Sequence, residues 1–428
     1  MGVVEVFGIF IVLLVIATPI ATSLGIVSVL PGAFDSSFTA SASYVIRSMV
    51  SGIDSFPMLA IPMFVLSGII MARGGVSRKL FDIFTYFIGK RSAGVPCAVI
   101  ITCLFYGAIS GSAPATVAAV GSMTIPILYN LGYDKTFSTA IVAVAGGLGV
   151  IIPPSIPYIL FSMASGESVG NLFKAGIVPG IMIALLLMGY AVFYCKKNGE
   201  DKEKINLIVD ALHEKGFLKI MKEGIWALLT PVIILGCIYG GIASPTEAAV
   251  ISVFYALFVS LVIYKSLRPK DILAICSEAI HTYGPLLFIL VASNAFSRVL
   301  TLMQVPQMVS NWILSSFSNQ IIILLVINLF LLIVGMVMDT SPAILIVTPI
   351  LLPIIVGIGM SPVQFGIFMV VNLAIGFVTP PIGVNLFVAS SLAEIPVMQI
   401  ARKALPMIIV FLVALLFITF VPAISLTL

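Results

Sequence analysis

Prolines recur in this sequence at a fixed distance from one half of the chain to the other. A separation of 227 positions relates three pairs, which are Pro126 and Pro353, Pro153 and Pro380, and Pro179 and Pro406. Two more pairs, 226 and 228 positions apart, are Pro19 with Pro245 and Pro114 with Pro342. Proline stands where the backbone requires its fixed φ angle and missing amide hydrogen. Apolar segments resemble one another in composition, but composition does not fix a common spacing. We therefore expect two repeats, residues 1–195 and 225–428, with residues 196–224 between them.

The repeats are too apolar for a soluble protein. The chain of 428 residues is 61% hydrophobic and 9% charged, whereas soluble domains carry about 25% charged residues. Apolar stretches recur at about the 20-residue length that crosses a bilayer, which predicts an all-α polytopic membrane protein. No basic residue precedes the apolar stretch 6–30, so we expect a first membrane helix there rather than a cleaved signal peptide. The net charge of +4 is spread out, which argues against nucleic-acid binding.

Four interruptions lie inside the apolar segments. The stretches 94–130 and 330–356 are broken near their middles by Gly, Ser, Thr and Pro. Unpaired backbone groups are not tolerated against lipid, so such breaks must lie inside protein or a cavity. We predict a re-entrant helical hairpin in each stretch. Adjacent prolines, Pro153-Pro154 and Pro380-Pro381, predict one broken transmembrane helix in each repeat.

Basic residues are distributed oppositely in matching parts of the repeats. Residues 73–91 contain five Lys or Arg, and the corresponding residues 299–317 contain none. Cytoplasmic loops collect Lys and Arg, so the two repeats should have inverted topology. The rule places the polar linker 196–224 and the N-terminus in the cytoplasm and the C-terminus in the periplasm of a bacterial inner-membrane protein. Inverted repeats are typical of secondary transporters, with the binding site between the repeats near the membrane midplane.

The four breaks supply oxygen atoms suited to a hard cation. Each proline frees a backbone carbonyl, and hydroxyl groups lie nearby. The predicted cation ligands, with Na⁺ as the metal, are Ser110, Gly111, Ser112, Pro153, Pro154, Asp339, Thr340, Ser341, Thr379 and Pro380. The alternative is simple kinking, with small residues packing helices together. We favour Na⁺ over H⁺ because few titratable groups lie in the apolar stretches.

Two acidic residues and four candidate substrate residues have alternative interpretations. Asp339 is either an intramembrane acid or a helix N-cap, and Glu247 follows Ser244 in a pattern typical of a capping box. The candidate substrate residues are Ser155, Ser293, Asn294 and Arg298. Arg298 either pairs with a carboxylate or anchors its helix at the membrane interface. Ser293 and Asn294 contact either substrate or a neighbouring helix.

No nucleophile–base pair or metal-ligand cluster stands out in the apolar region, so we do not expect an enzyme. We expect no cofactor beyond the coupling ion Na⁺. The five cysteines contain no C-x-x-C pair, and metal or disulfide sites are not expected.

Two pairs of motifs resemble those of the large, DctM-type subunit of TRAP transporters. They are GAISGSAPATVAAVGSMTIP (107–126) with GGLGVIIPPSIPYILFS (146–162), and GMVMDTSPA (335–343) with NLAIGFVTPPIGVNLF (372–387). The resemblance covers essentially the whole chain and is greatest to the sialic acid (SiaM) type, with C4-dicarboxylate members next. It implies the ion-transporter superfamily fold and Na⁺-coupled import of an organic acid by an elevator mechanism.

The resemblance also implies two protein partners. One is a small four-helix membrane subunit of the DctQ/SiaQ type, and the other is a periplasmic substrate-binding protein. The alternative function is a stand-alone Na⁺/carboxylate carrier of the same superfamily that needs no binding protein. Transport into vesicles without a periplasmic protein would distinguish the two.

Overall fold

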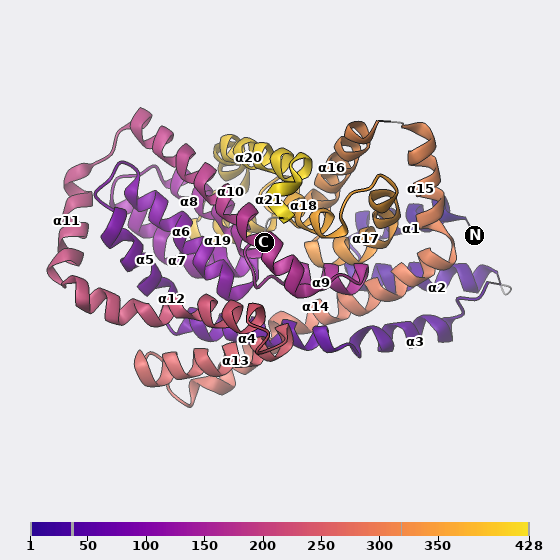
Figure 1. Cartoon of the computed structure of the whole chain (residues 1–428), viewed down its shortest axis with the longest axis horizontal. Coiled ribbons are helices and arrows are strands. Elements are labelled where there is room, and N and C mark those ends of the chain that lie inside the picture. The colour runs from indigo at the N-terminus through magenta and orange to yellow at the C-terminus, as the bar shows by residue number, and fades with distance from the viewer. Residues whose placement is uncertain (1, 36–37, 318, 427–428) are drawn as a thin grey trace.

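The computed structural model describes residues 2–35, 38–317 and 319–426, and these segments contain helices but no strands. Eight of the described helices are long and apolar enough to cross a membrane. The predicted all-α, multi-pass fold is therefore confirmed. Figure 1 shows the N-terminus at one end of the elongated molecule and the C-terminus near its middle.

The described helices lie in three parts of the chain, which are the part before the linker, the part after it and the linker itself. Those before the linker are α1 (Val3–Val15), α2 (Ile20–Phe34), α3 (Ala42–Ile53), α4 (Ala60–Arg73), α5 (Val76–Ile88), α6 (Gly94–Ser110), α7 (Ala113–Asn130), α8 (Lys135–Ala145), α9 (Ile156–Ser165) and α10 (Val169–Asn198). Those after it are α13 (Pro245–Phe258), α14 (Asp271–Leu302), α15 (Val305–Ser316), α16 (Gln320–Val337), α17 (Thr340–Gly357), α18 (Pro362–Gly376), α19 (Val384–Ala393), α20 (Val397–Phe420) and α21 (Pro422–Leu426). Helices α11 (Lys202–Glu214) and α12 (Phe217–Tyr239) connect the halves, and the short helices are η1 (Phe56–Leu59), η2 (Gly146–Val150) and the π-helix η3 (Val259–Ile263).

Three element boundaries differ from the sequence-based expectation. The stretch 6–30 forms two helices rather than one, because Pro19 directly precedes α2 and its ring disfavours helix at the residue before it. The second hairpin begins at Gln320 rather than at 330, since residues 320–329 contain no proline or glycine. The polar linker is also shorter than residues 196–224, because α10 continues to Asn198 and α12 begins at Phe217.

Close glycine contacts recur in the two repeats. A Cβ atom added to Gly107 of α6 would lie 2.6 Å from the Cα of Gly149. In the second repeat, a Cβ atom on Gly376 would lie 2.3 Å from the carbonyl carbon and oxygen of Gly335 in α16. In both places the first arm of the hairpin therefore meets, backbone to backbone, the helical segment that precedes the double proline.

We divide the described helices into two named groups. We call α1–α5 and α11–α15 the frame, and α6–α10 with α16–α21 the core unit. Within the frame, α4 packs against α13, and α14 packs against α2, α3 and α4 (Figure 1). Within the core unit, α7 packs against α19, α8 against α20, and α9 against α17. Because these core contacts join helices from different halves, neither repeat completes the core unit alone.

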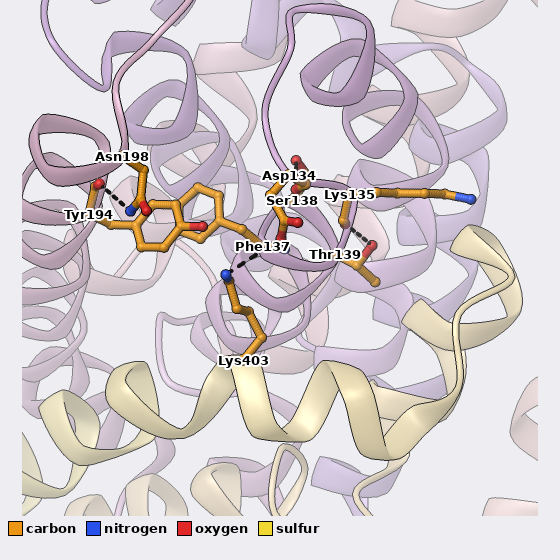
Figure 2. A network of polar contacts seen from close by, with 8 residues as sticks. All are labelled: Asp134, Lys135, Phe137, Ser138, Thr139, Tyr194, Asn198 and Lys403. Carbon is orange, nitrogen blue, oxygen red and sulfur yellow. Dashed lines mark hydrogen bonds and ion pairs between the residues drawn. The ribbon is translucent and has the colours of Figure 1, made fainter.

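A polar cluster joins the halves at the start of α8. Figure 2 shows Lys403 rising from α20 toward α8 and the end of α10. Its Nζ lies 3.7 Å from Oδ1 of Asp134 and 5.0 Å from the ring centroid of Tyr194. The Tyr194 ring stacks on Phe137 with 3.8 Å between the centroids. The cluster combines a partly exposed ion pair with a cation–π contact.

The linker is attached to the first hairpin and to α5. The Glu200 carboxylate accepts hydrogen bonds from the Ala93 backbone N–H at 3.0 Å and from the Tyr133 hydroxyl at 2.6 Å. These two residues lie at the start and just beyond the end of the hairpin. Asp210 of α11 pairs with Lys90 at 2.7 Å. The linker is thus a packed part of the structure.

Candidate functional site

A cavity of about 990 Å³ lies between the frame and the core unit. Both hairpin tips line it, through Ser110–Ser112 of the first and Asp339–Ser341 of the second. The frame lines the other side with residues of α4, α5 and α14. Six of the ten predicted cation ligands therefore border one space, although they come from segments more than 220 positions apart.

Hydroxyl groups close the first tip. Helix α6 ends at Ser110, and Gly111 follows with a φ of 61°, which glycine adopts without steric cost. The Ser110 and Thr116 hydroxyls lie 3.0 Å apart, and Thr116 also donates to the Ser112 carbonyl at 2.8 Å. Thr116 was missed by the sequence analysis. Its position four residues after Ser112, where a helical threonine reaches the i−4 carbonyl, could have indicated it.

A carboxylate defines the second tip. Asp339 precedes α17 as its N-cap and accepts a hydrogen bond from the Ser341 backbone N–H at 3.4 Å. The N-cap interpretation is therefore confirmed. Asp339 also lines the cavity, and its role as an acid within the membrane stays a prediction. Thr340 and Ser341 are buried beside it. Glu247 forms the predicted capping box, accepting from the Ser244 N–H at 2.8 Å, and it does not line the cavity.

Each broken helix meets the hairpin of its own repeat. In the first, the N–H of Ile156 donates to the carbonyl of Gly111 at 3.4 Å. In the second, the N–H of Ile382 donates to the carbonyl of Met336 at 3.3 Å. The remaining predicted ligands, Pro153, Pro154, Thr379 and Pro380, lie in these breaks, behind the tips, and do not line the cavity. Both double prolines have a cis peptide bond.

Two arginines border the cavity on the frame side. Arg73 ends α4 and forms an ion pair with Glu278 of α14. Arg78 of α5 pairs with Asp82, with 3.1 Å between its Nε and the carboxylate. Arg73, Arg78 and Glu278 line the cavity, and Asp82 does not. The side chain of Arg73 is 46% exposed and that of Arg78 is 52% exposed. The cavity therefore reaches the surface beside two cations, which sequence analysis treated only as a topology signal.

The four predicted substrate residues lie away from the cavity lining. Ser155 is fully buried and donates to the Val150 carbonyl at 2.5 Å. Ser293 is also fully buried, and Asn294 packs against Gly52 of α3. Arg298 is exposed near the C-terminal end of α14. A role for these residues in substrate binding stays a prediction.

The donor atoms at the tips suit a small hard cation. They are hydroxyl and carbonyl oxygens with one carboxylate, the ligand types that hard cations prefer. Among the described residues, no group of three or more His, Cys, Asp or Glu side chains could hold a metal ion.

Comparisons with known proteins agree with this geometry. The sequence matches the family described as "Tripartite ATP-independent periplasmic transporter, DctM component" over residues 7–424. It is 44% identical to the isethionate TRAP transporter permease DctMQ of Oleidesulfovibrio alaskensis, covering 98% of this chain and 65% of that protein. It is 40% identical to the C4-dicarboxylate large permease DctM of Pseudomonas aeruginosa (88% and 86% covered) and 32% identical to the sialic acid permease SiaM of Vibrio cholerae (90% and 89%).

The solved structure of the YdaH transporter of Alcanivorax borkumensis has a similar fold. Its TM-score is 0.66 at 12% sequence identity, with 93% of this chain and 96% of that chain covered. At this identity the likeness concerns the fold alone. The family match over residues 7–424 shows that the chain belongs to the DctM family of TRAP transporter large permeases.

Proposed function

We propose that this permease imports an organic anion by Na⁺-coupled, elevator-type alternating access. The observation that carries the proposal is the single cavity bordered by both hairpin tips on one side and by the frame on the other. A solute held at the tips belongs to the core unit. Sliding of the core unit along the frame would therefore carry the solute across the membrane.

Two features support co-transport of a cation with an anion. The tips offer hydroxyl and carbonyl oxygens and the Asp339 carboxylate, which attract Na⁺. Bound Na⁺ would in turn favour an anionic substrate, because the two ionic pairs at the frame leave no net positive charge there. Arg73 or Arg78 can exchange its carboxylate partner for the anion of a substrate passing the cavity mouth.

The relatives suggest the class of substrate. Their printed substrates are isethionate, C4-dicarboxylates and sialic acid, all organic anions. Sialic acid was the first choice from sequence, with C4-dicarboxylate next, and both remain candidates. Isethionate joins them because its transporter has the highest identity of the three, although this chain spans only 65% of that fused relative.

The position of the cavity mouth supports a proposal for the orientation of the chain in the membrane. Arg73 and Arg78 belong to the basic segment that the positive-inside rule assigns to the cytoplasm. We therefore assign the conformation described here to an inward-open state in the bacterial inner membrane, with the N-terminus cytoplasmic and the C-terminus periplasmic. The partners are a small membrane subunit of the DctQ/SiaQ type and a periplasmic binding protein, as the tripartite family description suggests.

Reconstitution tests the proposal. The permease and a small subunit are placed in liposomes with candidate binding proteins, and uptake of labelled isethionate, C4-dicarboxylates and sialic acid is measured with and without an inward Na⁺ gradient. We expect uptake of one anion that needs both the Na⁺ gradient and a binding protein. Uptake that needs Na⁺ but no binding protein would establish the stand-alone carrier instead. Uptake driven by a pH gradient without Na⁺ would refute Na⁺ coupling.

A further inference from the structure

A tyrosine of the first hairpin is hydrogen-bonded to the frame beside the cavity. Tyr106 lies on α6, one helical turn before the tip, and is 1% exposed. Its hydroxyl donates to the backbone carbonyl of Gly68 in α4 at 3.1 Å. Both residues line the cavity. The bond therefore crosses from the core unit to the frame next to the candidate transport site.

The same glycine lies against the hairpin tip. A Cβ atom added to Gly68 would be 3.2 Å from the Cα of Ser110. Residues four apart share one face of a helix, so Tyr106 and Ser110 both point from α6 toward α4. Gly68 thus touches the tip directly and accepts the Tyr106 hydrogen bond one turn farther back. The position of Ser110 is set by a contact and a bond to the same frame residue.

We infer that Tyr106 is a positioning residue that latches the first hairpin to α4 in the conformation described here. The inference rests on the proposed alternating access, because a core unit that slides along α4 must break this bond. A buried hydroxyl separated from its acceptor is costly unless water reaches it. The latch therefore favours the conformation in which the cavity opens beside Arg73. Loss of the hydrogen bond between Tyr106 and Gly68 shifts the population toward conformations in which α4 and α6 are separated.

A native cysteine can report the opening of this contact. Cys103 is fully buried and lies three residues before Tyr106, on the same face of α6. We expect a small neutral disulfide reagent to reach its buried sulfur faster when α6 separates from α4. When opening and closing are fast, the reaction rate is proportional to the open population. The other four cysteines are replaced by alanine so that only Cys103 reacts.

Two tyrosine variants isolate the latch. Tyr106→Phe removes only the hydroxyl that bonds across the boundary. The matched control, Tyr255→Phe, removes a hydroxyl that donates to the Trp226 carbonyl at 2.8 Å, with both partners inside the frame. We expect Tyr106→Phe to raise the Cys103 reaction rate by about fivefold, the population effect of one net hydrogen bond. The control should leave the rate unchanged.

A second variant tests the latch if Tyr106→Phe does not fold. Gly68→Ala keeps the tyrosine but presses a methyl group against Ser110, so it should raise the Cys103 rate in the same direction. Equal rates in wild type and in the folded variants would overturn the latch. An equal rise in the Tyr255→Phe control would also overturn it, because general loosening would then explain the result.

The substrate concentration that gives half-maximal uptake does not change when a variant only lowers the amount of folded protein. Per folded molecule, Tyr106→Phe should change the substrate concentration that gives half-maximal uptake, because it changes the share of inward-open protein. An unchanged half-saturation concentration with only less folded protein would contradict a positioning role. Absence of Na⁺-driven uptake in the wild type would refute the proposed function. It would not test the latch, because Cys103 labelling requires no transport.

Discussion

At the first hairpin tip, the hydroxyls of Ser110 and Thr116 lie 3.0 Å apart and bond to their own backbone, whereas the second tip presents the carboxylate of Asp339. Both tips break at the same place in their repeats and both line the cavity. The two tips thus share a break in the backbone but carry different side chains at it. The two tips should therefore hold cations of the same kind with different strength.

The hairpins also meet the frame differently. The first touches it mainly with its first arm, α6, which packs on α5 and α4, and the second with its second arm, α17, which packs on α14 and α15. Tyr106 bonds α6 to α4, but the corresponding positions of α16 are Ile333 and Val334, which carry no donor. We infer that the first hairpin is held by a directional bond and the second by apolar packing.

The largest effect should follow removal of the charge at the second tip. Asp339→Asn keeps an oxygen that can cap α17 but loses the carboxylate. A unit charge about 4 Å from a cation contributes about 4 kcal/mol at an effective dielectric constant of 20, so we expect the Na⁺ half-saturation concentration to rise about 100- to 1,000-fold. Uptake against a Na⁺ titration measures this. Glu247→Gln, which alters a carboxylate outside the cavity, is the control.

An unchanged Na⁺ dependence in folded Asp339→Asn protein would remove the distinction between the two tips. The cation would then be held by hydroxyls and carbonyls alone in both repeats.

The next effect concerns the paired glycines. Gly376→Ala places a methyl group 2.3 Å from the Gly335 backbone, and Gly107→Ala places one 2.6 Å from Gly149. Overpacking of this kind costs about 1–3 kcal/mol, so both variants should lower the thermal midpoint in detergent, and Gly376→Ala should lower it more. Gly189→Ala, where nothing lies within 4 Å of the added atom, is the matched control. A larger drop in thermal midpoint for Gly107→Ala than for Gly376→Ala would show that the closer packing lies in the first repeat.

A smaller effect should follow at the first tip. Thr116→Val keeps the side-chain shape but removes the hydroxyl that contacts Ser110 and Ser112. One net hydrogen bond contributes about 1 kcal/mol, so we expect the Na⁺ half-saturation concentration to rise about fivefold. The control is Thr124→Val, whose hydroxyl donates to the Val120 carbonyl at 2.8 Å elsewhere on α7. A change as large as that in Asp339→Asn would mean that the first tip dominates cation binding.

The smallest effect should come from the cluster in Figure 2. Lys403→Met removes the ion pair with Asp134 and the contact with Tyr194. Because the pair is 35% and 50% exposed, we expect a loss of stability of about 1 kcal/mol or less, seen as a small drop in thermal midpoint. Lys135→Met, at a lysine that points away from the cluster, should cause no drop. A loss of several kcal/mol would show that this contact, rather than apolar packing, joins the halves.

The breaks could be predicted from sequence because their cause is local. Proline restricts the backbone and glycine frees it at their own positions. The sequence therefore predicts the ends of α6 and α16 and the breaks at the double prolines. The partners of the tips could not be found in this way. Tyr106, Arg73 and Glu278 reach the cavity only because α4 and α14 pack beside the hairpins, and no local pattern records that packing.

The substrate residues illustrate the same limit. At the offset of 226 positions that relates Pro19 to Pro245, Ser293 and Asn294 correspond to Ser67 and Gly68. Of these four residues, Gly68 lines the cavity. The first repeat is interrupted before α4, by η1 (Phe56–Leu59), whereas the matching part of α14 is continuous. Equivalent residues therefore face different neighbours, and Asn294 packs against Gly52 of α3. A shared register specifies the order of helices but not which side of each helix meets the cavity.

The exchange of partners between the halves has a consequence for biosynthesis. Helices α7 and α8 are covered by α19 and α20, which leave the ribosome last. Helices α7 and α8 therefore remain in the membrane without these packing partners until translation is nearly finished. Chains truncated after the linker should be recognised by insertion chaperones or membrane proteases, and the two halves expressed as separate polypeptides should accumulate only when they are made together.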